Sequence, residues 1–328
     1  MSGRNPDRPG GRPGEFDLIE TYFAPLSGPG AFDLGDDAAV LTPPPGEQLV
    51  FTVDAIISGV HFLPDDPADH VAEKLVAVNL SDLAAMGAKG LGYLMTTAWP
   101  HDISKAWIAA FAKGLARAQS AHEIYLLGGD TVATNGPLSL SLTAIGTIPH
   151  GCALRRNGAR HGDGIYVSGR IGDAGVGLRI LRDELPGGDD INRREAVDRY
   201  RRPLPRLLLG RALRGVASAC IDISDGLVAD LGHLATQSDV CMRIELARLP
   251  LSPLADLIGG ALAAATAGDD YELLFTAPAK DEAGVMAAAK DARVPVTRIG
   301  QVMAGVGVEV LDDAGQSLTL DRPGYRHF

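Results

Sequence analysis

Segments with the period of a β-strand alternate along this chain with segments that have the period of an α-helix. Residues 49–54 (Leu-Val-Phe-Thr-Val-Asp) predict a strand that ends in a carboxylate, and residues 68–86 carry apolar side chains at helical spacing. The alternation runs through most of the 328 residues, a length that allows two domains. It predicts an α/β fold in which helices form layers against sheets.

The other expected elements follow the same two patterns. Helices are expected at 16–26, 104–120, 173–185, 204–216, 226–236 and 281–292, and strands at 91–98, 123–127, 138–148, 164–168, 271–276 and 296–302. A charged stretch at 183–202 with Pro186, Gly187 and Gly188 predicts an exposed loop and a helix. The polar, basic stretch at 149–164 is the candidate junction. We therefore expect an N-terminal domain at 15–150 and a C-terminal domain at 151–328.

The first 14 residues are rich in Gly, Pro and Arg and contain no apolar core of a signal peptide. They predict a flexible tail at 1–14. The three cysteines, Cys152, Cys220 and Cys241, are widely spaced and form no CxxC pair, which argues against a disulfide framework or a zinc site. No apolar run approaches the length of a membrane span. Together these features indicate a cytoplasmic protein.

Acidic residues recur beside glycine or another small residue, mostly where a predicted strand ends. They are Asp36, Asp37, Asp54, Asp82, Asp130, Asp222, Asp225, Asp269 and Asp270. Glycine lets the backbone approach a ligand closely, and α/β folds bind ligands at strand ends. Because Mg²⁺ prefers carboxylate, water and phosphate oxygens, the set predicts a site for several metal ions and a phosphorylated ligand.

Each acidic motif alone also has a structural explanation. A Gly-Asp-Asp sequence is commonly a turn, Asp82 falls within a predicted helix and could lie on its solvated face, and Ser224 with Asp225 could cap the next helix. Recurrence of one arrangement in a single chain favours the metal site.

The net charge agrees with this distribution. The chain has 30 basic and 41 acidic residues, a net charge of −11, which argues against a general nucleic-acid binder and against docking on an anionic membrane. Without the nine acids of the motifs, 32 acids would face 30 bases. The P-loop, dinucleotide-binding, GxSxG, HExxH and protein-kinase motifs are all missing from the sequence. If the protein binds ATP, metal ions must therefore neutralise much of its charge.

The combination of motifs resembles the thiamine-monophosphate kinases, a family with the aminoimidazole-ribotide synthetase fold. The resemblance rests on Gly-Glu-Phe-Asp-Leu-Ile at 14–19, Leu-Gly-Asp-Asp-Ala-Ala-Val at 34–40, Gly-Val-His-Phe at 59–62, Asn-Leu-Ser-Asp-Leu-Ala-Ala-Met-Gly at 79–87, Gly-Gly-Asp-Thr at 128–131, Asp-Ile-Ser-Asp-Gly-Leu at 222–227 and Gly-Asp-Asp-Tyr-Glu-Leu-Leu-Phe at 268–275. It extends to the C-terminal Gly-Tyr-Arg-His-Phe. One departure is Ser58, where family members often carry an acidic residue.

The resemblance implies two α/β domains, the first pairing with its copy in a homodimeric sheet or barrel. It implies Mg-assisted, in-line phosphoryl transfer from ATP to thiamine monophosphate, the last step in making thiamine diphosphate. The implied metal ligands are Asp36, Thr52, Val53, Asp54, Asp82, Asp130, Asp222 and Asp225. The implied ATP contacts are Gly129 and Asp130 in a turn, Arg155 and Ser224, with Arg156 an alternative to Arg155. The implied substrate contacts are His61, Glu272 and Tyr325, and the implied catalytic residues are Asp54, Asp130 and Asp225.

Two alternatives stay open. One is another ATP-using enzyme of the same superfamily, although relatives with a reactive cysteine near either terminus differ from this chain, whose first cysteine is Cys152. The other is a protein that binds nucleotide or thiamine phosphate without turnover.

Overall fold

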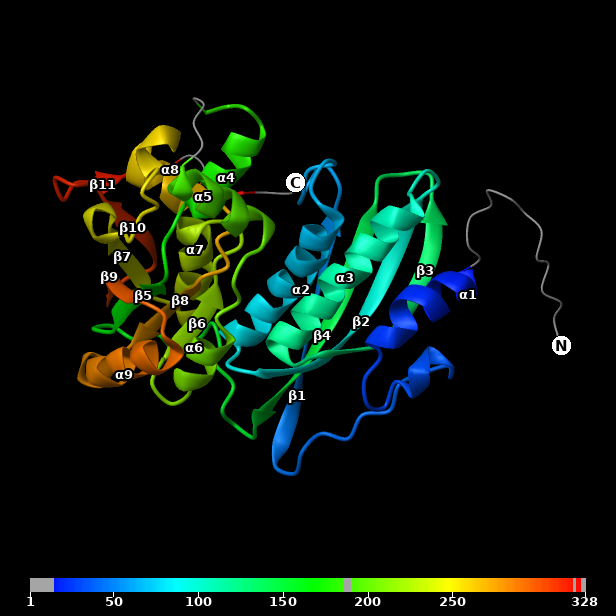
Figure 1. The fold of residues 1–328 in the computed structure, drawn as a ribbon. Coiled ribbons are helices and arrows are strands. Elements are labelled where there is room, and N and C mark those ends of the chain that lie inside the picture. The colour runs from blue at the N-terminus through cyan, green and yellow to red at the C-terminus, as the bar shows by residue number, and fades with distance from the viewer. Residues whose placement is uncertain (1–14, 186–189, 321–322, 326–328) are drawn as a thin grey trace, which may run out of the picture.

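The computed structural model describes residues 15–185, 190–320 and 323–325, which form two sheets with associated helices (Figure 1). A four-stranded sheet lies in the N-terminal half and a seven-stranded sheet in the C-terminal half. The expected two-domain α/β architecture is therefore confirmed. The tail expected at 1–14 and the glycines of the loop expected at 186–189 lie outside the described residues.

The N-terminal sheet has the strand order β1-β4-β2-β3. Its strands are β1 (Glu47–Ile57), β2 (Lys89–Pro100), β3 (Tyr125–Thr134) and β4 (Ser139–Pro149). Only β2 and β3 pair in parallel, since α3 (Lys105–His122) connects them as a crossover. The preceding helix is α2 (Ala68–Ala85), and the chain begins with α1 (Glu15–Leu18), a π-helical turn (Ile19–Phe23) and a 3₁₀ turn (Ala24–Leu26).

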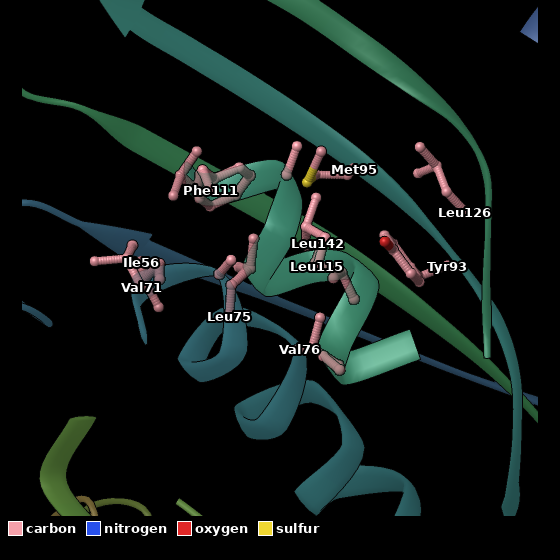
Figure 2. Close-up of a cluster of buried hydrophobic side chains, with 14 of the residues drawn as sticks. Ile56, Val71, Leu75, Val76, Tyr93, Met95, Phe111, Leu115, Leu126 and Leu142 are labelled. Carbon is pink, nitrogen blue, oxygen red and sulfur yellow. The ribbon is translucent and has the colours of Figure 1, made fainter. Parts of the chain in front are cut away.

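Apolar side chains of α2 and α3 pack against one face of this sheet (Figure 2). Leu75 and Phe111 from the helices meet Tyr93 and Leu142 from the strands, and all four are at most 1% exposed. Full burial of a side chain of this size contributes about 2–3 kcal/mol. This layer fixes which face of the sheet α2 covers, and so which side chains of β1 point toward it.

The opposite face of the N-terminal sheet carries exposed apolar side chains. Phe51 and Val53 on β1 are each 61% exposed, and Leu94 on β2 is 40% exposed. Residues 94, 53 and 143 lie in one row across the strands, because Val53 pairs with Thr143 and Thr143 with Leu94. We call this surface the open face of the N-terminal sheet.

The C-terminal sheet has the strand order β11-β10-β7-β9-β5-β8-β6, in which β7 and β10 pair in parallel and the other neighbours antiparallel. Its strands are β5 (Gly164–Ser168), β6 (Ala219–Asp222), β7 (Cys241–Glu245), β8 (Leu273–Ala277), β9 (Val296–Met303), β10 (Gly307–Leu311) and β11 (Ser317–Leu318). Its helices are α4 (Asp173–Leu181), α5 (Ile191–Arg201), α6 (Leu207–Ala212), α7 (Leu227–Ser238), α8 (Gly260–Thr266) and α9 (Glu282–Ala292). Strands β6, β7, β10 and β11 have no counterpart among the expected elements.

Three expected elements differ in extent. The helix expected at 16–26 is divided between α, π and 3₁₀ geometry. The helix expected at 173–185 ends at Leu181, since Asp183 adopts a left-handed φ of 57°. The helix expected at 204–216 begins only at Leu207, because Leu204 precedes a proline, which disfavours helical geometry.

The turn expected at Gly129-Asp130 is wrong. Strand β3 continues through both residues to Thr134, because its parallel pairing with β2 extends as far as Pro100. Gly129 is needed for a close approach and not for a turn: a Cβ at this position would collide with the carbonyl oxygen of Met95.

Among the described residues, the structure contains no helix of sufficient length and apolarity to cross a membrane.

Candidate active site

A cleft of about 1250 Å³ lies where the two halves of the chain meet. Strand β1 and helix α2 line it from the N-terminal half, and Figure 1 shows α2 on the side of this half that faces the C-terminal sheet. From the C-terminal half, α4, the segment after β6 and the Gly268-Asp269-Asp270 turn before β8 contribute. The cleft therefore gathers motifs that are far apart in the sequence, from Thr52 to Tyr325.

Six aspartates line this cleft, and four of them, which come from both halves of the chain, are predicted metal ligands: Asp54, Asp82, Asp222 and Asp225. The Thr52 hydroxyl donates to Asp82 at 2.5 Å, which joins β1 to α2. The Ser81 hydroxyl donates to Asp222 at 2.6 Å, and this bond joins α2 to the C-terminal half. Asp82 thus lies on the side of α2 that faces the cleft and not on a solvated face.

The clustering is electrostatically costly without cations. Burial, followed by the charges of Asp82 and Asp225, raises the pKa of Asp54 to about 6. Burial and the charge of Asp82 raise the pKa of Asp222 to about 8. Burial also raises the pKa of Asp82, although the Thr52 hydrogen bond and the nearby Arg156 oppose this effect. Asp54, Asp82 and Asp222 therefore resist ionisation at this site, and a bound cation would relieve that resistance.

The N-terminal end of α7 adds a carboxylate that sequence reasoning missed. Asp230 Oδ2 accepts from the backbone N–H groups of Ser224, Asp225 and Gly226 at 3.0–3.2 Å. These bonds fix the turn that presents Asp225 to the cleft. Burial and the charge of Asp225 raise the pKa of Asp230 to about 7.

His233 also lies near this turn. A ligand atom of its ring and one oxygen from each of Asp225 and Asp230 lie within 4.8 Å of one another. For Asp230 a sequence signal was available, because it is an acidic residue in the first turn of the helix predicted after Gly226.

One end of the cleft is lined by His61, Asp269 and Tyr271, and we call it the His61 end. His61 Nδ1 accepts from the Ile57 N–H at 3.1 Å, so the ring is held against the end of β1. The Tyr271 hydroxyl donates to Asp269 Oδ1 at 3.2 Å. Tyr325 also lines the cleft, and its N–H donates to the carbonyl of Asp225 at 2.9 Å.

Other expected site residues line a second cavity of about 650 Å³ on the open face of the N-terminal sheet. They are Asp36, Gly129 and Asp130. The strand register explains the separation: Asp130 pairs with Thr96, Thr96 with Ser141 and Ser141 with Ala55. Side chains alternate between faces along a strand, so Asp130 shares a face with Ala55, and Asp54 points to the other face.

The remaining expected residues lie in varied surroundings. Arg156 lines the cleft, whereas Arg155 is outside the lining and its carbonyl accepts from the Cys220 N–H at 2.9 Å. Glu272 is 4% exposed and lies outside the lining, ion-paired with Arg206 and hydrogen-bonded by the Ser168 hydroxyl. Val53 directs its side chain to the open face. Ser224 lines the cleft beside Asp225.

The described donor set fits a hard divalent cation. Carboxylate and hydroxyl oxygens converge from β1, α2 and the segment after β6, and three of the four carboxyls have raised pKa values. Oxygen ligands of this kind suit Mg²⁺, which usually shares its coordination shell with substrate phosphates.

Comparison with known proteins agrees with this architecture. Residues 35–148 match the model of the AIR synthase related protein N-terminal domain, and residues 160–313 match that of the C-terminal domain. The two halves and the carboxylate-lined cleft between them thus define the class as AIR synthase related. The thiamine-monophosphate kinase of Caulobacter vibrioides is 42% identical over 325 residues, which cover 96% of this chain and 91% of that protein.

Solved structures give the same result. The crystal structure of thiamine-monophosphate kinase from Stenotrophomonas maltophilia K279a is 43% identical, has a TM-score of 0.79 and covers 87% of this chain and 91% of its own. A structure described as AaThiL complexed with AMPPCP and TMP is 31% identical, with a TM-score of 0.77 and coverage of 90% and 91%. The chain belongs to the thiamine-monophosphate kinase family.

Proposed function

We propose that this protein transfers the γ-phosphoryl group of ATP to thiamine monophosphate and so makes thiamine diphosphate and ADP. The observation that carries the proposal is the convergence of Asp54, Asp82, Asp222 and Asp225 from both halves of the chain on one cleft. Its support from comparison is the relative whose description names AMPPCP, an ATP analogue, and TMP as bound together.

The acceptor needs little activation by the protein. A phosphate monoester has a second pKa near 6, so its oxygens are largely unprotonated at neutral pH and require no general base. The obstacle is repulsion between the acceptor and the phosphates of ATP, which fixed positive charge can overcome. Arg156 and Arg182 bring permanent positive charge to the lining of the cleft.

We assign the cation-binding role in the cleft to Thr52, Asp54, Asp82, Asp222 and Asp225. Bound Mg²⁺ would supply neutralisation of phosphate charge and alignment of the two substrates. The residues themselves hold the oxygens in place: Thr52 and Ser81 orient the carboxyls of Asp82 and Asp222. Asp36, Asp130 and the Val53 carbonyl remain predicted metal ligands, and Gly129 with Asp130 remains a predicted ATP contact.

For the substrates, we assign His61 and Tyr325 to thiamine monophosphate and Ser224 with Arg156 or Arg155 to ATP. His61 and Tyr325 line the cleft, as do Ser224 and Arg156. Glu272 remains a predicted substrate residue, and its ion pair with Arg206 gives it a role in holding the segment before β8.

A homodimer is the proposed assembly, with a second copy covering the open face of the N-terminal sheet. The exposure of Phe51, Val53 and Leu94 on this face supports the proposal, because large exposed apolar surfaces mark interaction sites. We also propose the domain division at 150/151. The two domains pack on each other across it, since Ala84 and Ala85 of α2 lie in one apolar cluster with Leu209 and Leu213 of the C-terminal half.

We propose a cytoplasmic location as well, which three free cysteines support.

Incubation with Mg²⁺, ATP and thiamine monophosphate, followed by chromatography, tests the function. We expect equal amounts of thiamine diphosphate and ADP, and neither product in quantity when thiamine replaces thiamine monophosphate. The Asp54→Asn variant should be inactive, with Asp65→Asn as the matched control because Asp65 is exposed and lies outside the cleft lining. Tight binding of both ligands without either product would support the non-catalytic alternative.

A further inference from the structure

Lys74 places a buried ammonium group between the two halves of the chain. It lies on α2 among apolar neighbours and is only 2% exposed, a degree of burial that lysine rarely shows unless it is paired. Its Nζ donates to the His61 carbonyl at 2.9 Å and to Asp269 Oδ2 at 3.1 Å. The same Nζ lies 3.9 Å from the centre of the Tyr200 ring, in a cation–π contact.

These three partners come from separate parts of the fold. His61 lies in the loop after β1, Asp269 in the turn before β8, and Tyr200 on α5. His61 and Asp269 both line the His61 end of the cleft. A single side chain from α2 therefore sets the separation between an N-terminal loop and a C-terminal turn.

A second set of contacts holds the same loop. Arg201 on α5 pairs with Asp66 at 2.6 Å, and the Tyr200 hydroxyl donates to the His61 carbonyl at 3.5 Å. The loop from β1 to α2 is thus anchored to α5 at two points. Among the contacts of this loop in the described part of the chain, Lys74 alone links it to the Asp269 turn. The same turn holds Tyr271, whose hydroxyl donates to Asp269.

We propose that Lys74 is a positioning residue that fixes the His61 loop and the Asp269 turn at the spacing required to bind the acceptor. This inference rests on the proposed function, because it assigns the acceptor to the His61 end. Without the ammonium, the His61 carbonyl and the Asp269 carboxylate lose their shared donor and repel each other. Small displacements of substrate-positioning groups reduce catalysis strongly.

The test is Lys74→Met, compared with Arg117→Met. Arg117 on α3 pairs with Asp69 and Glu73 of α2, the helix that carries Lys74, at 2.7 and 2.5 Å. Because Arg117 lies outside the cleft lining, the control removes ion pairs of α2 without changing the His61 end. We expect Lys74→Met to raise the KM for thiamine monophosphate roughly tenfold or more, with less than about a twofold change in the KM for ATP. Arg117→Met should change neither value. A parallel rise of both KM values, or a kcat loss with neither KM changed, would overturn the proposal.

A double variant separates positioning from general loss of stability. Asp269→Asn removes the carboxylate that Lys74→Met leaves without its ammonium, so the double variant should have a KM for thiamine monophosphate no higher than Lys74→Met alone. Independent, additive effects of the two substitutions would contradict the assigned link.

Hydrogen exchange measured without substrate tests Lys74 independently of the reaction. Amides in 58–66 and 268–271 should exchange at least about tenfold faster in Lys74→Met than in wild type and Arg117→Met. Unchanged exchange in both segments would overturn the proposal, even if the wild type makes thiamine diphosphate. If the wild type fails to make thiamine diphosphate while both segments loosen, the proposed function is wrong and the structural link stands.

Discussion

Asp54→Asn should make the metal-free protein more stable while making it inactive. Asp54 is held near Asp82 and Asp225, and burial and these charges raise its pKa from 3.8 to about 6. A difference of this size between folded and unfolded chain corresponds to about 3 kcal/mol. The asparagine keeps the shape of the side chain and removes the charge.

The pH dependence follows from the direction of the change. Between about pH 4 and pH 6 the Asp54 carboxyl is protonated in the folded chain and increasingly ionised in the unfolded chain. The wild type therefore loses stability relative to Asp54→Asn as the pH rises through this window. Well below pH 3.8, wild type and Asp54→Asn both carry an uncharged side chain at position 54, and the difference between their free energies of unfolding disappears.

The assay is urea denaturation in EDTA, followed by circular dichroism, at about pH 4 and pH 8. At pH 8 the free energy of unfolding of Asp54→Asn should exceed that of wild type by about 2–3 kcal/mol, and near pH 4 by less than about 1 kcal/mol. Adding Mg²⁺ with ATP should stabilise the wild type and not the variant. A variant less stable than wild type at pH 8, or a difference independent of pH, would refute the electrostatic reasoning.

Three further predictions address the site and the assembly. Asp54→Asn and Asp130→Asn should each lower kcat by about two or more powers of ten, measured by coupled ADP release, and near-normal turnover in both would contradict a site with several metal ions. His61→Ala should weaken thiamine monophosphate binding more than ATP binding in calorimetry, whereas equal losses would indicate a packing role. Phe51→Lys should shift the protein from dimer to monomer in sedimentation velocity, unlike the exposed control Val306→Lys, and an unchanged dimer would place the interface elsewhere.

The part of the cleft that sequence predicted depends on local patterns. A strand ending near Asp54 and a helix containing Asp82 follow from periodicity, and each lies in the expected type of element, β1 and α2. Asp222 and Asp225 follow a short apolar run that forms β6. Because these signals depend only on neighbouring residues, a single sequence is enough to detect them.

The separation of Asp54 from Asp130 could not be predicted in this way. It depends on the register of β1, β4, β2 and β3 across the sheet, and a slip of one residue would reverse the face on which a side chain lies. The same holds for Glu272, because its partner Arg206 is far away in the sequence. Long-range pairing therefore decides which members of the acidic set share a cleft.

Lys74 shows a signal that was present and not used. Two charged residues, Glu73 and Lys74, separate Ala72 from Leu75, and Lys74 is at helical spacing from Val71 and Val78 on the face that periodicity predicts to be buried. A buried charge requires a partner, but sequence alone does not identify Asp269 or the His61 carbonyl as that partner.

The central claim is that carboxylates from both halves of the chain together hold the cations that bind phosphate. The most direct test is a crystal structure with Mn²⁺, AMPPCP and thiamine monophosphate, in which anomalous scattering locates the metal ions. We predict ions within coordination distance of Asp54 and Asp82 on one side of the cleft and of Asp222 or Asp225 on the other. Density for both ligands with no ion bound between the two halves would contradict the account.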